Sequence, residues 1–415
     1  MKNNFLQEMQ DRGFLNQCTN LDKLGEICNK KAISGYIGFD CTASSLHVGS
    51  LLQIMILKLM QKYGHQPIVL LGGGTTLIGD PSGKESTRKI LEQNEIKHNI
   101  KSIKKVFSKI LNTSNKKTSP IFVDNADWLT KLNYIQFLRD TGSHFTINKM
   151  LSFESVKLRL DREQSLSYME FNYMILQAYD FLELNKNKNC MLQIGGSDQW
   201  GNIINGVELI KRHSNSHVYG LTTPLITLAS GVKMGKTEKG AVWLDKKLLS
   251  PFNYFQFWRN TDDRDVIKFL KMFTDLKLSK IEKIKDDNIN DLKMLLAKQA
   301  TEMLHGNYEA TKAYETTVSV FVKKEINNQI DLPVIKLKKK EIKDGLSILD
   351  LVTRAKLLKS KSEVRRAIKD KGIKIDDTPI ENDGYLILMS DFKENINLFK
   401  LSHGKKNHII IKLIN

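Results

Sequence analysis

The sequence is poor in cysteine and proline, and it lacks any long apolar run. Only 4 of its 415 residues are cysteine and 7 are proline. No C-x-x-C pair occurs, which argues against a zinc site and against a disulfide framework, so we expect a reducing, cytoplasmic location. No apolar stretch approaches the ~20 residues needed to cross a bilayer, and the N-terminal segment lacks the apolar core of a signal peptide. We therefore expect no membrane association.

Length and charge define the broad class of the protein. A chain of 415 residues is too long for one ordinary core, so two or three domains are expected. The net charge of +18 favours a polyanionic partner: RNA, DNA or an anionic membrane surface. Lysine is abundant along the whole chain, however, so charge alone does not identify that partner.

The apolar pattern predicts an α/β fold. A short strand is expected at residues 34–40, an apolar helix at 48–63 and a continuous apolar strand at 67–71. Strand, helix and strand in this order form a βαβ unit of a parallel sheet. Further short strands are expected at 121–123 and 191–194.

The remainder of the chain divides into a helical part and a small basic part. We place a catalytic α/β domain at residues 1–222 and a helical domain at 223–326. A lysine-rich linker is expected at 327–345, followed by a small α+β domain at 346–415.

Three loops that follow predicted strands are rich in small and polar residues: 38–49, 72–84 and 195–201. In open α/β sheets, ligands bind where the carboxyl ends of the strands meet, so these loops can converge on one crevice. His47 and Gly49 lie at a predicted helix N-terminus, which suits phosphate. A histidine that merely caps the helix explains the same pattern.

Two lysine-containing loops are candidates for phosphate binding. The segment from Gly79 to Lys84 is not a Walker A motif, because only three residues separate Gly79 from Gly83 and a glutamate follows Lys84. The segment Lys233-Met234-Gly235-Lys236-Thr237 carries two lysines that can grip separate phosphate oxygens. A solvated turn is its simpler interpretation.

A polar face interrupts an otherwise apolar helix near residue 175. Tyr173, Gln177 and Asp180 follow one another at spacings of four and three residues, so they share one helix face. Apolar neighbours such as Phe171 and Ile175 make a solvated face a poor explanation. The face is therefore a candidate ligand site.

Together these motifs resemble the class I aminoacyl-tRNA synthetases. The histidine–glycine pair and the K-M-x-K-[ST] loop match the two signatures of that class. The combination with Tyr36, Asp40, the 79–84 loop, the Tyr173 face and the segment 195–200 is similar to the tyrosyl-tRNA synthetase family in particular. The resemblance covers nearly the whole chain and implies a Rossmann-type catalytic domain.

The resemblance implies roles for seven tyrosine-binding residues. Tyr36 and Asp180 would bind the phenolic hydroxyl. Asp80, Tyr173 and Gln177 would hold the ammonium group. Gln193 and Gln199 would line the region of the carboxylate.

ATP would occupy the neighbouring space. The nucleotide-binding residues implied by the resemblance are Gly38, Asp40, Thr42, His47, Gly49, Gly196, Asp198, Lys233 and Lys236. The groups that would act on the phosphates during catalysis are His47, Lys84, Arg88, Lys233, Lys236 and Thr237. Ser50 and Ile37 depart from residues common in the family, which we interpret as variation in ATP affinity.

The C-terminal part resembles the RNA-binding fold of ribosomal protein S-four. Lys361, Arg365, Arg366 and Lys371 would contact RNA phosphates. Another lysine-rich stretch, 97–117, can add to the RNA-attracting field, although a solvated helix explains it more simply.

The implied reaction joins L-tyrosine to ATP and passes it to tRNA(Tyr). ATP is a substrate, Mg²⁺ is expected to accompany it, and no dedicated protein metal site is expected. The family implies a homodimer. Two alternatives stay open: a tryptophanyl-tRNA synthetase, which would have no phenol for Tyr36 and Asp180, and an RNA-binding protein that has lost catalysis. The second predicts broken signatures, yet His47, Lys233 and Lys236 are present.

Overall fold

The computed structural model describes residues 4–81, 91–237, 240–319, 332–392, 397–404 and 407–414. The chain forms two compact units, Met1–Asn307 and Tyr308–Asn415. The first contains a six-stranded sheet and a group of helices, and the second contains a five-stranded sheet.

The sheet of the first unit has the strand order β1-β6-β5-β2-β3-β4. Its strands are β1 (Gln17–Cys18), β2 (Ser34–Asp40), β3 (Gln66–Gly72), β4 (Ile121–Asp124), β5 (Cys190–Gly196) and β6 (Tyr219–Thr223). All neighbouring strands are parallel except β1, which runs antiparallel to β6. The chain builds β2, β3 and β4 in one direction and then returns to add β5 and β6 on the other side of β2. The strand order therefore reverses between β2 and β5. The predicted parallel α/β fold is confirmed.

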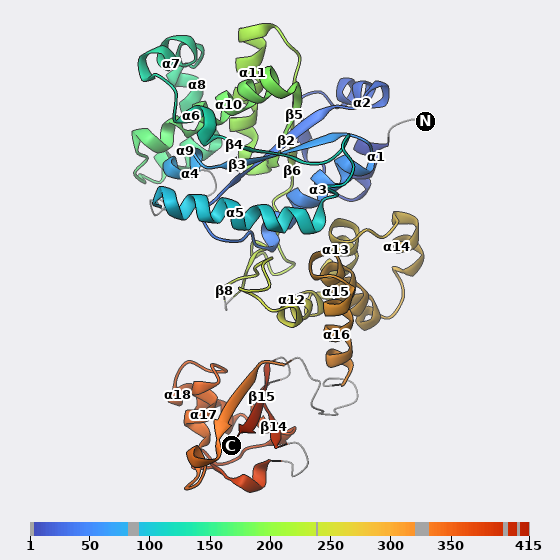
Figure 1. Cartoon of the computed structure of the whole chain (residues 1–415), viewed down its shortest axis with the longest axis vertical. Coiled ribbons are helices and arrows are strands. Elements are labelled where there is room, and N and C mark those ends of the chain that lie inside the picture. The colour runs from blue at the N-terminus through green and yellow to red at the C-terminus, as the bar shows by residue number, and fades with distance from the viewer. Residues whose placement is uncertain are drawn as a thin grey trace. The chain divides into compact units, whose positions relative to one another are not determined.

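Helices cover both faces of this sheet (Figure 1). α10 (Tyr168–Lys188) and α11 (Trp200–Ser214) lie on one face, and α3 (Leu51–Lys62) and α5 (Gln93–Ile110) lie on the other. Successive side chains of β2 point to opposite faces of the sheet and contact both helix layers. Tyr36 packs on Phe181 of α10, whereas Phe39 packs on Phe107 of α5. β3 is apolar throughout because both of its faces are buried.

Seven shorter helices in the described residues also belong to this part of the first unit. They are α1 (Phe5–Asp11), α2 (Leu21–Lys30), α4 (Thr75–Ile78), α6 (Ala126–Leu129), α7 (Tyr134–Asp140), α8 (Ile147–Ser152) and α9 (Glu154–Asp161). The hairpin strands β7 (Lys236–Thr237) and β8 (Gly240–Ala241) pair antiparallel. α10 begins with a capping box between Ser167 and Glu170, which fixes the start of the helix that carries three predicted site residues.

A helical group follows in the same unit. It contains α12 (Pro251–Arg259), α13 (Val266–Phe273), α14 (Leu278–Ile284) and α15 (Ile289–His305). Trp258, Phe269 and Phe273 pack against one another and are fully buried. Since the sheet and these helices form one compact unit, the division at residues 222 and 223 stays a prediction.

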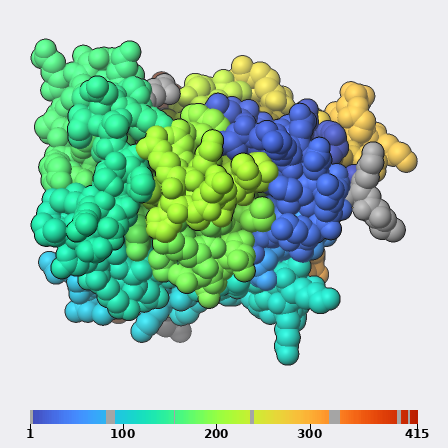
Figure 2. Space-filling model, turned by 90° about the horizontal axis from the view of Figure 1, so that it is seen from above, coloured from blue at the N-terminus to red at the C-terminus, as the bar shows by residue number. Residues whose placement is uncertain are grey.

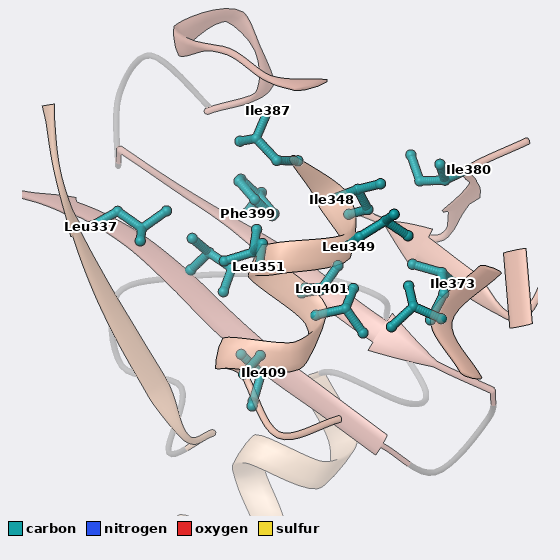
Figure 3. Packing of buried hydrophobic residues seen from close by; sticks show 14 of the residues in the cluster. Leu337, Ile348, Leu349, Leu351, Ile373, Ile380, Ile387, Phe399, Leu401 and Ile409 are labelled. Carbon is teal, nitrogen blue, oxygen red and sulfur yellow. The ribbon is translucent and has the colours of Figure 1, made fainter. Parts of the chain in front are cut away.

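The second unit has its own sheet and core. Its sheet order is β12-β11-β14-β15-β9, with β11 (Ile373–Ile375), β12 (Thr378–Pro379), β14 (Leu398–His403), β15 (Asn407–Ile414) and β9 (Val334–Lys338). The other elements are α16 (Asn307–Thr317), β10 (Leu346–Ser347), α17 (Ile348–Arg354), α18 (Lys361–Lys369) and β13 (Leu386–Ile387). Figure 3 shows apolar side chains of α17 facing those of the sheet, including Leu351 and Phe399.

The predicted linker at residues 327–345 is wrong in its central part. Val334–Lys338 is β9, which pairs in parallel with Ile410–Ile414 of β15. Leu337 is fully buried, while Lys336 and Lys338 are exposed. The lysines made this stretch resemble a solvated connection, yet alternating apolar and lysine residues are typical of an edge strand. Residues 327–331 of the predicted linker lie outside the described ranges.

Candidate active site

A cavity of about 300 Å³ opens at the carboxyl ends of β2 and β5, where the strand order reverses. This is the position at which open α/β sheets bind their ligands. All seven predicted tyrosine-binding residues line it: Tyr36, Asp80, Tyr173, Gln177, Asp180, Gln193 and Gln199. Five predicted nucleotide-binding residues line it as well: Gly38, Asp40, Gly49, Gly196 and Asp198. The structure thus brings together residues that are up to 163 positions apart in the chain, from Tyr36 to Gln199.

Asp180 is a buried carboxyl group at one end of this cavity. Its two oxygens accept hydrogen bonds from Asn125 Nδ2 at 2.9 Å and from Trp128 Nε1 at 2.7 Å. Burial raises the pKa of Asp180 to about 7, although both hydrogen bonds act in the opposite direction. The two donors fix the orientation of the carboxyl group before any ligand enters.

Two buried polar atoms in the cavity lack a partner. Among the described residues, the hydroxyl of Tyr36 and the Oε1 of Gln193 have no hydrogen bond, and both side chains are 2% exposed. A buried polar atom without a partner is costly in free energy and rare in folded proteins. Burial raises the pKa of Tyr36, so its hydroxyl stays protonated and can donate. A polar ligand that reaches these atoms would satisfy both.

A chain of amide groups connects Asp80 to α10. Gln199 Nε2 donates to Asp80 Oδ2 at 2.9 Å. Asn202 Nδ2 lies 3.1 Å from Gln199 Oε1 and 3.0 Å from Gln177 Oε1 and donates to both. These hydrogen bonds hold the carboxylate of Asp80 at the cavity wall. The amides of Gln199 and Gln177 can exchange their present partners for polar groups of a ligand.

Asp40 adds a second carboxylate. It accepts from Thr75 Oγ1 at 3.0 Å, and the Tyr173 hydroxyl lies 3.3 Å from both of its oxygens. A third carboxyl group, Asp198, has its pKa raised by burial and by Asp80, while the charge of Lys233 acts in the opposite direction. A cavity lined by so many carboxyl groups favours a cationic group such as an ammonium.

The two predicted signatures lie against each other. His47 precedes the short 3-10 helix Val48–Ser50, and its Nδ1 accepts from Gly49 N at 3.0 Å. A Cβ on Gly49 would lie 2.8 Å from the carbonyl oxygen of Met234. A Cβ on Gly235, whose φ is +119°, would lie 2.7 Å from His47 Nδ1. Both glycines are required by this close approach.

Several predicted site residues do not line the cavity, and others lie outside the residues that the structure describes. Thr42, His47 and Lys233 are not among the described residues that line it. Lys84 and Arg88 lie outside the described residues. Lys236 and Thr237 form β7 through their backbone, and their side chains are not described.

Sequence reasoning missed Asn125, Trp128, Thr75 and Asn202. Asn125 is fully buried, and besides Asp180 it binds Gly74 N at 2.8 Å and Thr75 Oγ1 at 3.0 Å. It directly follows β4, so the rule that favours residues at the carboxyl ends of parallel strands could have identified it. Asn202 lies three residues after Gln199 on one helix face, which is a weaker signal.

The predicted RNA-binding residues lie on the second unit. Lys361, Arg365 and Arg366 are on α18 and Lys371 follows it, and all four are exposed. Three of them form surface ion pairs: Lys361–Asp350 at 2.5 Å, Arg365–Asp383 at 3.2 Å and Lys371–Glu381 at 3.1 Å. Exposed pairs of this kind contribute little to stability, so an RNA phosphate can replace the carboxylate.

No group of three or more histidine, cysteine, aspartate or glutamate side chains in the described ranges is arranged to hold a metal ion. Within those same ranges, no helix is both long and apolar enough to span a membrane.

The raised pKa of Asp180 predicts a pH dependence of stability. The folded state keeps a proton that the unfolded state releases above about pH 4. The free energy of unfolding should therefore fall as pH rises from about 4 to about 7 and level off above, by at most ~1.4 kcal/mol per pH unit from this group. When the Asp180→Asn variant is unfolded in urea, its free energy of unfolding should not show this pH-dependent contribution. Equal slopes in the two proteins between about pH 5 and pH 7 would contradict the assignment.

Comparison with known proteins places these features in a family. The family model for "tRNA synthetases class I (W and Y)" matches residues 28–322. The chain is 64% identical over 412 residues to the tyrosine–tRNA ligase of Pelagibacter ubique, covering 99% of this chain and all of that protein. It is 49% identical over 412 residues, with the same coverage, to the tyrosine–tRNA ligase of Rickettsia prowazekii.

Solved structures give the same relationship. A C-terminally truncated mitochondrial tyrosyl-tRNA synthetase of Aspergillus nidulans superimposes with a TM-score of 0.69 at 30% identity, over 76% of this chain and 94% of that one. The tyrosyl-tRNA synthetase of Archaeoglobus fulgidus, solved with L-tyrosine, shares the fold with a TM-score of 0.55 at 16% identity, over 75% of this chain and 99% of that one.

Proposed function

As a member of the bacterial-type tyrosyl-tRNA synthetases of class I, the chain is a tyrosine–tRNA ligase, and we propose that the cavity at β2 and β5 is its tyrosine and ATP site. One observation carries the assignment of the cavity. Tyr36 OH and Gln193 Oε1 are buried there without a partner, beside the carboxyl group of Asp180. A phenol that binds Tyr36 and Asp180 supplies the missing partner of the Tyr36 hydroxyl.

The phenol end of the site explains rejection of phenylalanine. A bound phenylalanine would leave the Tyr36 hydroxyl unpaired and would cover Asp180 without a hydrogen bond. A site built to bond a hydroxyl discriminates strongly against a ligand that lacks it, a rule for which tyrosine–tRNA ligases are themselves the usual illustration. Asn125 and Trp128 strengthen the effect, because they prevent the carboxyl group from turning away.

The ammonium group of tyrosine fits the other end. Asp80 supplies a carboxylate, and Gln177 and Tyr173 supply oxygen atoms on the adjacent face of α10. The amide chain through Gln199 and Asn202 keeps Asp80 at this position. The negative charge of Asp80 at one end and the hydroxyl-binding pair Tyr36 and Asp180 at the other end set the length of the ligand and the direction in which it binds.

Activation needs no general base. The carboxylate of tyrosine is already ionised at neutral pH, since α-carboxyl groups have pKa values near 3.5. It attacks the α-phosphorus of ATP, pyrophosphate leaves, and negative charge accumulates on the leaving group. His47, Lys233 and Lys236 are the cations and donors that we assign to these phosphates, because the two signatures that contain them are in contact. Bound Mg²⁺ would neutralise phosphate charge. The terminal ribose hydroxyl of the tRNA then attacks the carbonyl carbon of the mixed anhydride, and AMP leaves.

Pyrophosphate exchange into ATP, measured with each of the twenty amino acids, tests this proposal. We expect exchange that depends on tyrosine alone. Exchange with tryptophan would keep the fold and overturn the roles of Tyr36 and Asp180. Absence of exchange in a folded protein supplied with Mg²⁺ would overturn the assigned catalytic residues.

We also propose a homodimer, supported by an exposed apolar surface between α7 and the start of α10. Large apolar side chains that are exposed in this segment are Tyr134, Ile135, Leu138, Ile147, Leu151, Leu158, Leu160 and Tyr168. Figure 2 shows this segment, in teal to green, gathered along one side of the molecule. A segment with many exposed large apolar side chains is typical of a protein interface, and a second copy of the chain is the occupant that the family implies.

Replacing Ile135 with glutamate should dissociate this dimer. Ile135 is 71% exposed, so the change has little effect on the folded subunit but would bury a charge in the interface. We expect sedimentation to show a monomer at micromolar concentration. The matched control is Leu248→Glu, at a position 47% exposed and outside the segment, which should stay dimeric. A dimeric Ile135→Glu protein would exclude this surface.

Binding of tRNA is assigned in part to the second unit, through Lys361, Arg365, Arg366 and Lys371. All four side chains are exposed, whereas Val364 and Ile368 of α18 are buried, and this exposure supports that role. We propose a cytoplasmic location, which agrees with four cysteines that are all free thiols.

A further inference from the structure

Helix α5 carries a row of lysines that the reaction described above does not use. Lys97, Lys101, Lys105 and Lys109 follow one another at intervals of four residues, so they lie along one side of the helix. All four are exposed. We call them the lysine stripe. The buried side chains of α5, among them Ile96, Ile103 and Phe107, point the opposite way, onto the sheet.

The lysine stripe has little acidic charge nearby in sequence, since Glu95 in the first turn of α5 is the last carboxylate before Asp124. No aspartate or glutamate occurs between Ile96 and Val123. None of the four lysines forms an ion pair with any residue that the structure describes. Like charges four residues apart repel and weaken a helix. On α2, by contrast, Lys23 is flanked by Asp22 and Glu26. A row of like charges along most of a helix fits a surface that meets a polyanion.

The position of α5 relates this surface to the active site. Asn99 Nδ2 of α5 donates to the carbonyl oxygen of Cys41 at 2.9 Å, and Cys41 directly follows Asp40 at the cavity. At the other end, α5 contacts α15, where burial lowers the pKa of His305 and the charge of Lys109 lowers it further. Figure 1 shows α5 running along the outside of the sheet. The lysine stripe therefore extends from the loop beside the catalytic cavity to the helical group of the same unit.

We propose that the lysine stripe binds the phosphate backbone of the tRNA whose 3' end enters the cavity. The four lysines span thirteen residues, so the first and last are ~18 Å apart along the helix, which is enough to follow about five phosphates of one strand. Such contacts are independent of base sequence and depend strongly on salt. Lys104 is excluded, because it lies at the flank with its Nζ 6.0 Å from the ring centroid of Phe122. The inference rests on the proposed tRNA-charging reaction.

The test is the triple variant Lys97→Gln/Lys101→Gln/Lys105→Gln in the full-length protein. We expect tyrosine-dependent pyrophosphate exchange to be unchanged, because that step does not involve tRNA. The KM for tRNA(Tyr) should rise about tenfold, and the slope of its logarithm against the logarithm of salt concentration should fall by about 3. The Tm should be equal to or higher than that of the wild type, since repulsion within α5 is removed.

The matched control is Lys23→Gln/Lys30→Gln/Lys31→Gln, which removes the same charge from α2 and its C-cap, where acidic residues are interspersed. It should leave the salt slope unchanged. Equal changes in both triple variants would mean that only net charge matters and would overturn the proposal, as would an unchanged KM in the α5 variant. Loss of exchange in the α5 variant would also overturn it. Absence of exchange in the wild type would instead reject the proposed function.

Discussion

Alanine at position 180 should raise the KM for tyrosine about 100-fold in pyrophosphate exchange and leave the KM for ATP within about twofold. The change removes the acceptor that we propose for the phenolic hydroxyl and leaves two buried donors, on Asn125 and Trp128, without a partner. Hydrogen bonds to a charged group are worth about 1.5–3 kcal/mol each, and ~2.7 kcal/mol corresponds to 100-fold. Discrimination against phenylalanine should fall by a similar factor.

Glu183→Ala is the control on the same helix. Glu183 lies one turn further along α10 and accepts a hydrogen bond from Asn187, and it is not among the described residues that line the cavity. Its replacement should leave the KM for tyrosine nearly unchanged. An Asp180→Ala enzyme with normal tyrosine affinity would remove this residue from the site, and an equal loss for tyrosine and ATP would point to a general collapse of the cavity.

Removal of residues 332–415 should abolish tRNA charging while amino-acid activation continues. We expect kcat/KM for tRNA(Tyr) to fall by at least about 100-fold, since several phosphate contacts are lost together, and pyrophosphate exchange to stay within about twofold. The cavity lies wholly in the first unit. Normal charging by the shortened enzyme would exclude the second unit from tRNA binding.

The position of the cut is itself a prediction. A chain that ends at residue 345 retains β9 without its partner β15. The apolar side of β9, with Leu337 and Ile335, would then be exposed beside unpaired backbone groups, which promotes aggregation. Light scattering should detect association of the longer fragment but not of the shorter one. Equal solubility of the two would argue against β9 as an integral strand.

The sequence predicted those parts of the site that rest on local periodicity. Tyr173, Gln177 and Asp180 were found because helical spacing places them on one face, and the loops after β2 and β5 because small residues follow apolar strands. Asn125 could have been identified from its place after β4, but its contact with Asp180, like that of Trp128, depends on the pairing of β3 with β4, which brings residue 125 beside α10. β9 was missed for a similar reason, since its partner strand begins more than seventy residues later. A contact between two segments that are distant in sequence leaves no periodic pattern in the sequence of either segment.

The five-stranded sheet also sets an order of events during synthesis. β15 lies between β9 and β14 but follows both in the chain, so a nascent polypeptide presents two strands whose common neighbour has not yet been made. Domains generally fold as units from the N-terminus. At typical elongation rates, the interval between the end of the first unit and β15 is on the order of ten seconds. On the ribosome, the part of the enzyme that activates tyrosine can therefore be complete before the sheet of the C-terminal unit can close.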